Sequence, residues 1–454
     1  MRRFQSFIAV LLNAFLFVCQ SVFALEPVDF THLAQPVGES DLESTMETMT
    51  YVRCWYREAN THDDVKTAWQ WALKEDGSYY QIAGYWYSND FLKNMFYTDV
   101  PQSDIMAACQ RSIDLTHDKL DITFFAADTS ASFNYTIWTN DQATNLSEGK
   151  INKIVSFGDS LSDTGNVFNG SFWLFPNRNS WFLGHFSNGL LWTEYLAKTM
   201  RVPLYNWAIG TSGSTDQYFF LKGIKSQLVS FERYMKLSKN YHPENTLFTL
   251  EFGLNDFLLF NTPLDEVKQH FDETLDKLVK LHAKHIVIML VPDASRIPGY
   301  KKVDKNLRLA LRKKIISYND HIKQKIGEYQ AMGVNIITFD VFHLLEKLHE
   351  NPKKYGFDNV TDACLDIKKT DTSVYFSSYH LTDACQEIGS DKYVFWGNTH
   401  PTTMAHQYFS SHLLKQMKTS FNFKTQTFLK SGRYFFDRFN HPVLFPSWDG
   451  TLNE

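Results

Sequence analysis

Short apolar runs alternate with longer amphipathic stretches from residue 151 onward. The apolar runs predict buried strands at residues 153–157, 204–209, 246–251, 285–291 and 334–339. Between several of them, as at 265–284 and 306–330, apolar residues recur at helical spacing, which predicts helices with one buried side. This alternation predicts an α/β fold in which a parallel sheet is covered by helices on both faces.

Residues 25–145 show a different pattern, in which short aromatic-rich runs alternate with turn signals. The predicted strands of this region lie at 49–56, 79–87, 121–127 and 135–138. Asp76-Gly77-Ser78 has the composition of a hairpin turn. We therefore expect a small, mostly β N-terminal domain at 25–145 and the α/β domain at 146–420. Residues 421–454 are a C-terminal extension to which the sequence assigns no role.

The first 24 residues have the pattern of a secretory signal peptide. Two arginines precede an apolar stretch at 7–18, and Val22-Phe23-Ala24 provides a cleavage site. A lipoprotein signal at Cys19 would need small residues before it, but Phe17 and Val18 are bulky. The pattern predicts a secreted protein that is cleaved near Ala24.

Charge and composition narrow the classes of partner. The net charge of −5 leaves no basic excess to pair with phosphates, so we expect no nucleic-acid partner. Aromatic residues make up 16% of the chain, and such side chains suit contact with lipid headgroups. We therefore expect transient contact with a membrane surface, without a spanning segment after the signal peptide. No cluster of His, Cys, Asp or Glu has metal-ligand spacing, so we expect no metal.

Removal of the signal peptide would leave an even number of cysteines, which in an exported protein favours disulfides. Proximity along the chain favours the pairs Cys54–Cys109 and Cys364–Cys385. The second pair would close a loop just upstream of His400. Such a loop either staples the fold or gates a site, and the sequence leaves both open.

Ser160 is the strongest candidate for chemistry. It follows Gly158-Asp159 directly after a predicted strand, in a pattern of strand, tight turn and helix start. The backbone N–H at such a turn is unpaired, and the helix dipole favours developing negative charge there. A serine hydroxyl also needs a base within hydrogen-bond reach. His400 is the best candidate, because the following Pro401 favours an extended, loop-borne conformation.

Gly210 and Asn255 follow other predicted strands. The carboxyl ends of parallel strands share one edge of a sheet, so both residues should lie near Ser160. Gly210 permits close approach of a substrate, and the Asn255 amide can donate to an oxyanion. Taken singly, each fits a structural role equally well, as a turn glycine and a capping asparagine.

In their order and spacing, these residues resemble the GDSL branch of the SGNH hydrolases. The resemblance implies a three-layer sandwich, a nucleophile at Ser160 and a base at His400. It also implies oxyanion donors at Ser160, Asn255 and either Gly210 or Thr211. Over residues 48–417 the chain looks like the thermolabile haemolysins, which are secreted bacterial phospholipases and lysophospholipases. This likeness is carried by the segments 51–57, 94–98, 181–189 and 246–257.

The chain departs from the family at two positions. Gly210-Thr211-Ser212 stands where relatives have Gly-Gly-Ala, which leaves open whether Gly210 or Thr211 faces the oxyanion. Gly397 stands where most relatives have the aspartate that orients the histidine. Something else must then satisfy Nδ1–H of His400: a backbone carbonyl, a water, a remote carboxylate or a bound anion. Our hypothesis is that chloride or water occupies this place, with no other cofactor.

The sequence thus predicts a secreted serine hydrolase that cleaves acyl esters of phospholipids or lysophospholipids through an acyl-serine intermediate. Acyl transfer to another alcohol is a related expectation. The alternatives are a carbohydrate or short-chain carboxylesterase on the same fold, and an inactive lipid-binding relative.

Overall fold

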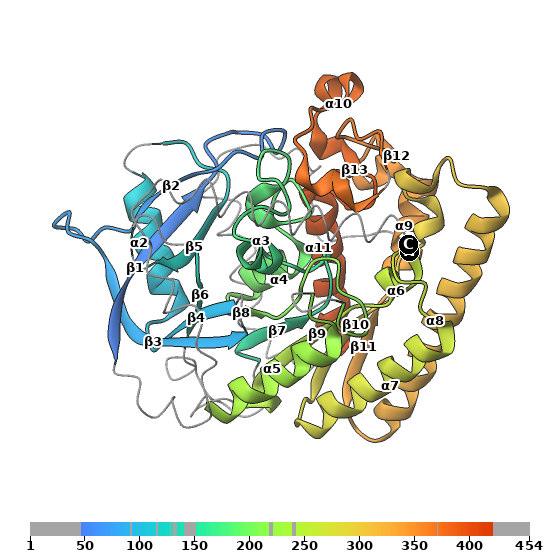
Figure 1. Cartoon of the computed structure of the whole chain (residues 1–454), viewed down its shortest axis with the longest axis horizontal. Helices are drawn as coiled ribbons and strands as arrows, with labels where there is room; N and C mark the ends of the chain where they lie inside the picture. The colour runs from blue at the N-terminus through green and yellow to red at the C-terminus, as the bar shows by residue number, and fades with distance from the viewer. Residues whose placement is uncertain are drawn as a thin grey trace, which may run out of the picture.

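The computed structural model describes residues 47–420, except 91–92, 115–116, 128, 130–133, 140–150, 218–220, 238–241 and 370. The predicted signal peptide, the domain boundary at 145–146 and the C-terminal extension therefore lie outside the described residues. Two sheets dominate the molecule, one in each predicted domain (Figure 1).

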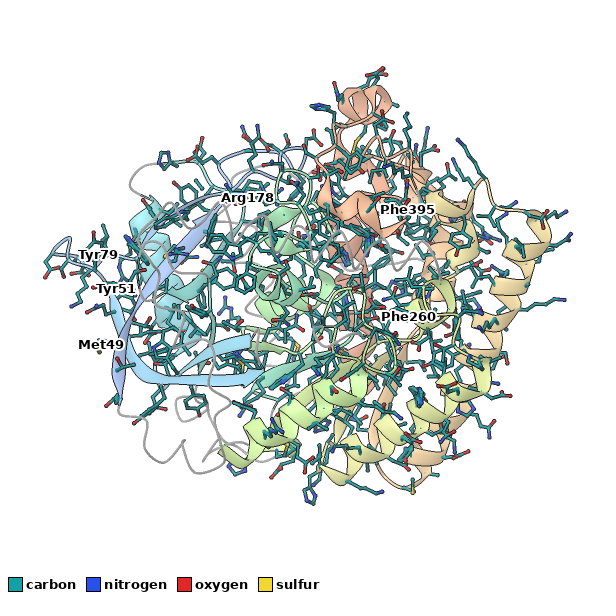
Figure 2. The ribbon with its side chains drawn as sticks, in the orientation of Figure 1. Met49, Tyr51, Tyr79, Arg178, Phe260 and Phe395 are labelled. Carbon is teal, nitrogen blue, oxygen red and sulfur yellow. A yellow bond between two sulfur atoms is a disulfide. The ribbon has the colours of Figure 1, made fainter. Side chains whose placement is uncertain are left out.

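The N-terminal region folds into a six-stranded sheet with one helix. Its strands are β1 (Thr48–Tyr56), β2 (Ala68–Trp71), β3 (Gln81–Asp90), β4 (Lys93–Thr98), β5 (Ile122–Ala127) and β6 (Thr136–Thr139), and its helix is α2 (Gln102–Asp114). The order is β2-β1-β3-β4-β6, with β5 also paired to β1. The sequence pattern did not predict β2, β4 or α2. Tyr51 and Tyr79 lie on the outer side of this sheet (Figure 2).

The second region contains a five-stranded parallel sheet in the order β11-β10-β9-β7-β8. Its strands are β7 (Lys153–Phe157), β8 (Leu204–Asn206), β9 (Thr246–Leu250), β10 (His285–Met289) and β11 (Asn335–Phe339). All five strands lie within the predicted apolar runs. Every residue of β7 and β9 is buried, because helices cover both faces of the sheet.

Helices complete the three layers of the α/β region. α5 (Ile224–Leu237), α7 (Leu264–Lys280) and α8 (Lys305–Ala331) pack side by side on one face of the sheet (Figure 1). α4 (Trp192–Met200) and α11 (Thr403–Ser420) pack against each other on the opposite face. Shorter helices connect these elements: α3 (Asn166–Gly170), α6 (Leu254–Leu258), α9 (Val341–Glu350) and α10 (Asp383–Ile388). In the described part of the chain, no helix has the length and apolar character needed to cross a bilayer.

A small cap formed by residues 359–395 sits above the sheet at the top of Figure 1. It holds the two-stranded sheet of β12 (Asn359–Ala363) and β13 (Tyr393–Phe395), together with α10. The structure joins the two cysteine pairs that proximity favoured. Cys54–Cys109 links β1 to α2, and Cys364–Cys385 closes the loop between β12 and α10.

Candidate active site

Ser160 lies in the turn after β7, and Gly158 makes this turn possible. A Cβ at Gly158 would lie 2.2 Å from Oε1 of Glu251, so only glycine leaves room for that carboxyl group. Glu251 in turn accepts the N–H of Asp159 at 2.7 Å. The backbone oxygen of Asp159 accepts the N–H of Ser162, which closes the turn around Ser160.

The helix expected at Ser160 begins only at Asn166. The Asp163 carboxylate accepts the N–H groups of Gly165, Asn166 and Val167 and so caps α3. Because this carboxylate takes up the free N–H groups, Asp163 rather than Ser160 lies at the N-terminal end of the helix. The expectation of a helix dipole at Ser160 is therefore wrong, and the Ser160 N–H belongs to a turn.

The structure brings Ser160 and His400 together. Ser160 Oγ lies 2.7 Å from Nε2 of His400, although 240 positions separate the two residues in the sequence. His400 is buried in the loop between β13 and α11, and its carbonyl accepts the N–H groups of Trp396 and Gly397. Burial lowers the pKa of His400 to about 3, which keeps its imidazole neutral and able to accept a proton.

On the other side of the ring, Nδ1 of His400 lies 3.1 Å from the hydroxyl of Tyr375. Tyr375 is buried, and burial raises its pKa to about 12, so the hydroxyl is neutral. The space beside Gly397 is partly filled, because a Cβ there would lie 2.7 Å from Cη2 of Trp181. The Trp181 indole N–H is buried and has no hydrogen-bond partner among the described residues.

The backbone around Gly210 and Thr211 distinguishes the two candidate donors. The Gly210 N–H donates to Oδ2 of Asp163 at 2.7 Å and is therefore engaged. Thr211 has a φ of 63°, in the left-handed region that non-glycine residues rarely adopt. Among the described residues, the N–H groups of Ser160 and Thr211 have no hydrogen-bond acceptor. Thr211 rather than Gly210 thus has the N–H available to an oxyanion.

Asn255 lies in the first turn of α6, which begins at Leu254, a short loop after β9 ends at Leu250. Its amide donates to the Ser212 carbonyl at 2.9 Å and to Oδ2 of Asp159 at 3.2 Å. Burial raises the pKa of Asp159 to about 7. Burial and the adjacent Asp159 charge raise the pKa of Glu251. Donation from Asn255 to an oxyanion would exchange one of its two present bonds, of which that to Asp159 is the longer.

Tyr375 and Asp163 are the functional candidates that the sequence analysis did not identify. Asp163 follows Ser160 closely, and its position before Gly165-Asn166 is the pattern of a helix cap, which could have pointed to it. Tyr375 is one of 22 tyrosines and lies in no motif, so no sequence signal singled it out. Within the described ranges, no group of three or more His, Cys, Asp or Glu side chains is arranged to hold a metal ion.

Two protein families match the chain. Residues 154–413 match the GDSL-like lipase/acylhydrolase family, which covers more than half of the sequence. Residues 26–140 match the N-terminal domain of the Vibrio dual lipase/transferases.

Three relatives illustrate the range of similarity. The thermolabile hemolysin of Vibrio parahaemolyticus is 48% identical over 381 residues, which cover 84% of this chain and 91% of that protein. The phosphatidylcholine-sterol acyltransferase of Aeromonas hydrophila is 22% identical over 60% of this chain and 91% of its own length. The secreted effector protein SseJ of Salmonella typhimurium is 25% identical over 59% of this chain, and the match spans 64% of that protein.

Proposed function

Since the chain belongs to the GDSL-like lipase/acylhydrolase family, we propose that it is a secreted serine hydrolase of (lyso)phospholipid acyl esters that works through an acyl-serine intermediate. The observation that carries the proposal is the 2.7 Å contact between Ser160 Oγ and His400 Nε2. This is hydrogen-bond reach for a serine and its general base, and burial keeps the base neutral.

In this mechanism, His400 accepts the proton of Ser160 as Oγ attacks the ester carbonyl. Nδ1 carries the ring's other hydrogen and donates a hydrogen bond to the Tyr375 oxygen. This bond fixes the tautomer and the orientation of the ring. His400 next protonates the leaving alcohol. Water, or another alcohol in acyl transfer, attacks the acyl-serine and releases the product.

The tetrahedral intermediate needs donors for its oxyanion. We assign the N–H groups of Ser160 and Thr211 and the amide of Asn255 to this role. Asp163 positions the second donor indirectly, because its bond to the Gly210 N–H holds the Ile209–Gly210 peptide, which adjoins the peptide that carries the Thr211 N–H.

We also propose that a chloride ion or a water lies beside His400. The Tyr375 hydroxyl orients the imidazole but is neutral, so it offers little stabilisation to the imidazolium that forms during turnover. The ring of Trp181 lies beside Gly397, and its buried indole N–H has no partner among the described residues, so it fits an anion or water as its acceptor. Such an anion would supply the negative charge that an aspartate at position 397 would carry.

Two features of the relatives support the substrate class. One relative is named for hemolysis and another for acyl transfer from phosphatidylcholine to a sterol. The N-terminal match is to a dual lipase/transferase domain. We therefore propose phospholipid and lysophospholipid esters as substrates, with brief contact with a membrane surface during each encounter.

Secretion is supported by the two disulfides and by the signal-like pattern at residues 1–24.

The decisive experiment measures fatty-acid release from phosphatidylcholine and lysophosphatidylcholine and acetate release from an acetylated sugar, with Ser160→Ala as control. We expect release from the two lipids by the wild type and none by the variant. Preference for the sugar ester would favour a carbohydrate esterase. Lipid binding without release by the wild type would indicate an inactive relative, and full activity of Ser160→Ala would remove the mechanism.

A further inference from the structure

The beginning of α8 carries a strong local positive charge. Residues 301–316 contain seven Lys or Arg and a single Asp, in a chain whose net charge is −5. Helical spacing places Lys305, Leu309, Lys313 and Ile316 on one side of the helix, and we call these residues the basic face of α8. All four side chains are exposed, with 47% of Leu309 and 38% of Ile316 accessible to solvent. The nearby Leu307 is 64% exposed.

Several of these cations have no partner within the protein. Lys302, Lys305, Arg308 and Lys313 form no ion pair or side-chain hydrogen bond with any described residue. The single acid, Asp304, is occupied in capping α8, where it accepts the N–H groups of Asn306 and Leu307.

The three remaining cations are engaged. Lys301 pairs with Asp362, and Arg312 pairs with Asp293 and Glu346. Lys314 donates to the Thr262 carbonyl at 3.0 Å. The basic face thus presents uncompensated charge together with apolar side chains.

The basic face borders the edge of the sheet that carries the active site. A helix that follows a parallel strand begins at the carboxyl edge of the sheet, which is where Ser160 and Asn255 lie. The segment between β10 and α8 contacts the His400 loop directly, since the Gly299 N–H donates to the Asn398 carbonyl at 2.9 Å. The bond from Lys314 to Thr262 ties the same helix to the segment that follows α6. α8 runs along the right-hand side of the molecule in Figure 1.

We propose that the basic face of α8 docks the enzyme on a bilayer surface rich in anionic phospholipid, and so presents the active site to lipid. This docking proposal rests on the proposed function. It adds to it the surface that meets the membrane and the charge of the lipid headgroups. The cations complement acidic headgroups, each contributing about 1 kcal/mol near such a surface. Leu309 and Ile316 can enter the headgroup boundary between the lysines. A nucleic acid would use the lysines alone and leave these apolar side chains exposed.

The test measures flotation with vesicles of phosphatidylcholine alone or mixed with phosphatidylglycerol, using Ser160→Ala so that the vesicles stay intact. The variant Lys305→Glu/Lys313→Glu is compared with Lys66→Glu/Lys74→Glu, which changes the same charge at exposed lysines of the N-terminal region. We expect the first pair to lower partitioning onto anionic vesicles by about thirtyfold or more and the control pair to have little effect. Leu309→Ser should weaken the same binding, and added salt should weaken it in the parent protein.

Equal partitioning of both double variants would overturn the proposal. So would loss of heparin binding in Lys305→Glu/Lys313→Glu with unchanged vesicle binding, since that marks a site for polyanions other than the lipid surface. Turnover of a soluble short-chain ester by the same double variant, with Ser160 intact, should equal that of the wild type. Failure of the wild type to release fatty acid would count against the proposed function alone, because vesicle binding is measured without turnover.

Discussion

The hydroxyl of Tyr375 lies 3.1 Å from Nδ1 of His400, on the side of the ring away from Ser160. Tyr375 belongs to the loop that the Cys364–Cys385 disulfide closes. A loop closed by a disulfide thus provides the hydrogen-bond partner of His400 Nδ1, which a glycine at position 397 cannot provide. A neutral hydroxyl orients an imidazole as a carboxylate does but stabilises its protonated form less, because it carries no full charge.

Replacing Tyr375 with Phe should lower kcat for a soluble ester by about 10- to 10²-fold, since the variant leaves Nδ1–H of His400 without its acceptor at a cost of about 1–3 kcal/mol. KM should change little, because the ring itself is kept. Tyr379→Phe on the same loop is the matched control, as no bond of its hydroxyl is seen among the described residues. Unchanged kcat in Tyr375→Phe would show that the hydroxyl does not orient the base.

Removal of halide should lower activity. Dialysis into a chloride-free acetate buffer would empty a chloride site beside His400, and titration with chloride should restore kcat in a saturable manner. Far-UV circular dichroism in both buffers controls for unfolding. Activity that is independent of halide would argue against chloride and leave water, with the Tyr375 hydroxyl, as the partner of Nδ1.

Substitution of Asn255 by Ala should reduce kcat by about 10²–10³-fold, the usual effect of losing one oxyanion donor. Asn398→Ala provides the comparison, because Asn398 also lies near His400 but its amide donates to the Lys369 carbonyl at 2.7 Å, away from the chemistry. If the two variants lost activity equally, the Asn255 amide would have a structural role only.

The acid limb of kcat/KM should lie well below pH 6.5, the ordinary pKa of histidine. Burial lowers the pKa of His400 to about 3, so the ring stays in its neutral, proton-accepting form as the pH falls. The profile is measured with a soluble ester whose own hydrolysis is negligible over this range. A limb centred near pH 6.5 would show that His400 titrates as an exposed histidine does.

Acid should also destabilise the fold. Burial lowers the pKa of both His400 and His406 to about 3, so below pH 6.5 the unfolded chain binds protons more readily than the folded one. Their contribution to stability is present above pH 6.5 and is lost as the pH falls toward 3. Urea unfolding at several pH values checks this, and His406→Phe should flatten the dependence. A slope that is equally steep in that variant would exclude His406 as its source.

The double substitution Cys364→Ser/Cys385→Ser should lower kcat by roughly tenfold through loosening of the loop that carries Tyr375. Cys54→Ser/Cys109→Ser breaks a bridge of the N-terminal region, and it should lower the stability of that region with little effect on kcat. Stability is followed by urea unfolding and kcat with the soluble ester. An unchanged kcat in the first variant would favour simple stapling.

The sequence alone determined the parallel sheet and the edge at which Ser160 and Asn255 lie, whereas His400 was identified from its loop and from the family resemblance. Buried parallel strands leave continuous apolar runs, and their carboxyl ends must share one edge, so local pattern and topology suffice. The strands of the N-terminal sheet were predicted less completely. β2 and β4 were missed because their runs of four and six residues are short and show no clear period.

Only the tertiary structure decided which groups form hydrogen bonds with the residues of the site. Tyr375 reaches His400 from a separate loop, and Asp163 withdraws the Gly210 N–H so that Thr211 is left to donate. Asp163 also moves the start of α3 away from Ser160. Such hydrogen bonds join side chains whose separation in the sequence carries no information about their distance in space. They depend on packing between elements, which no local pattern encodes.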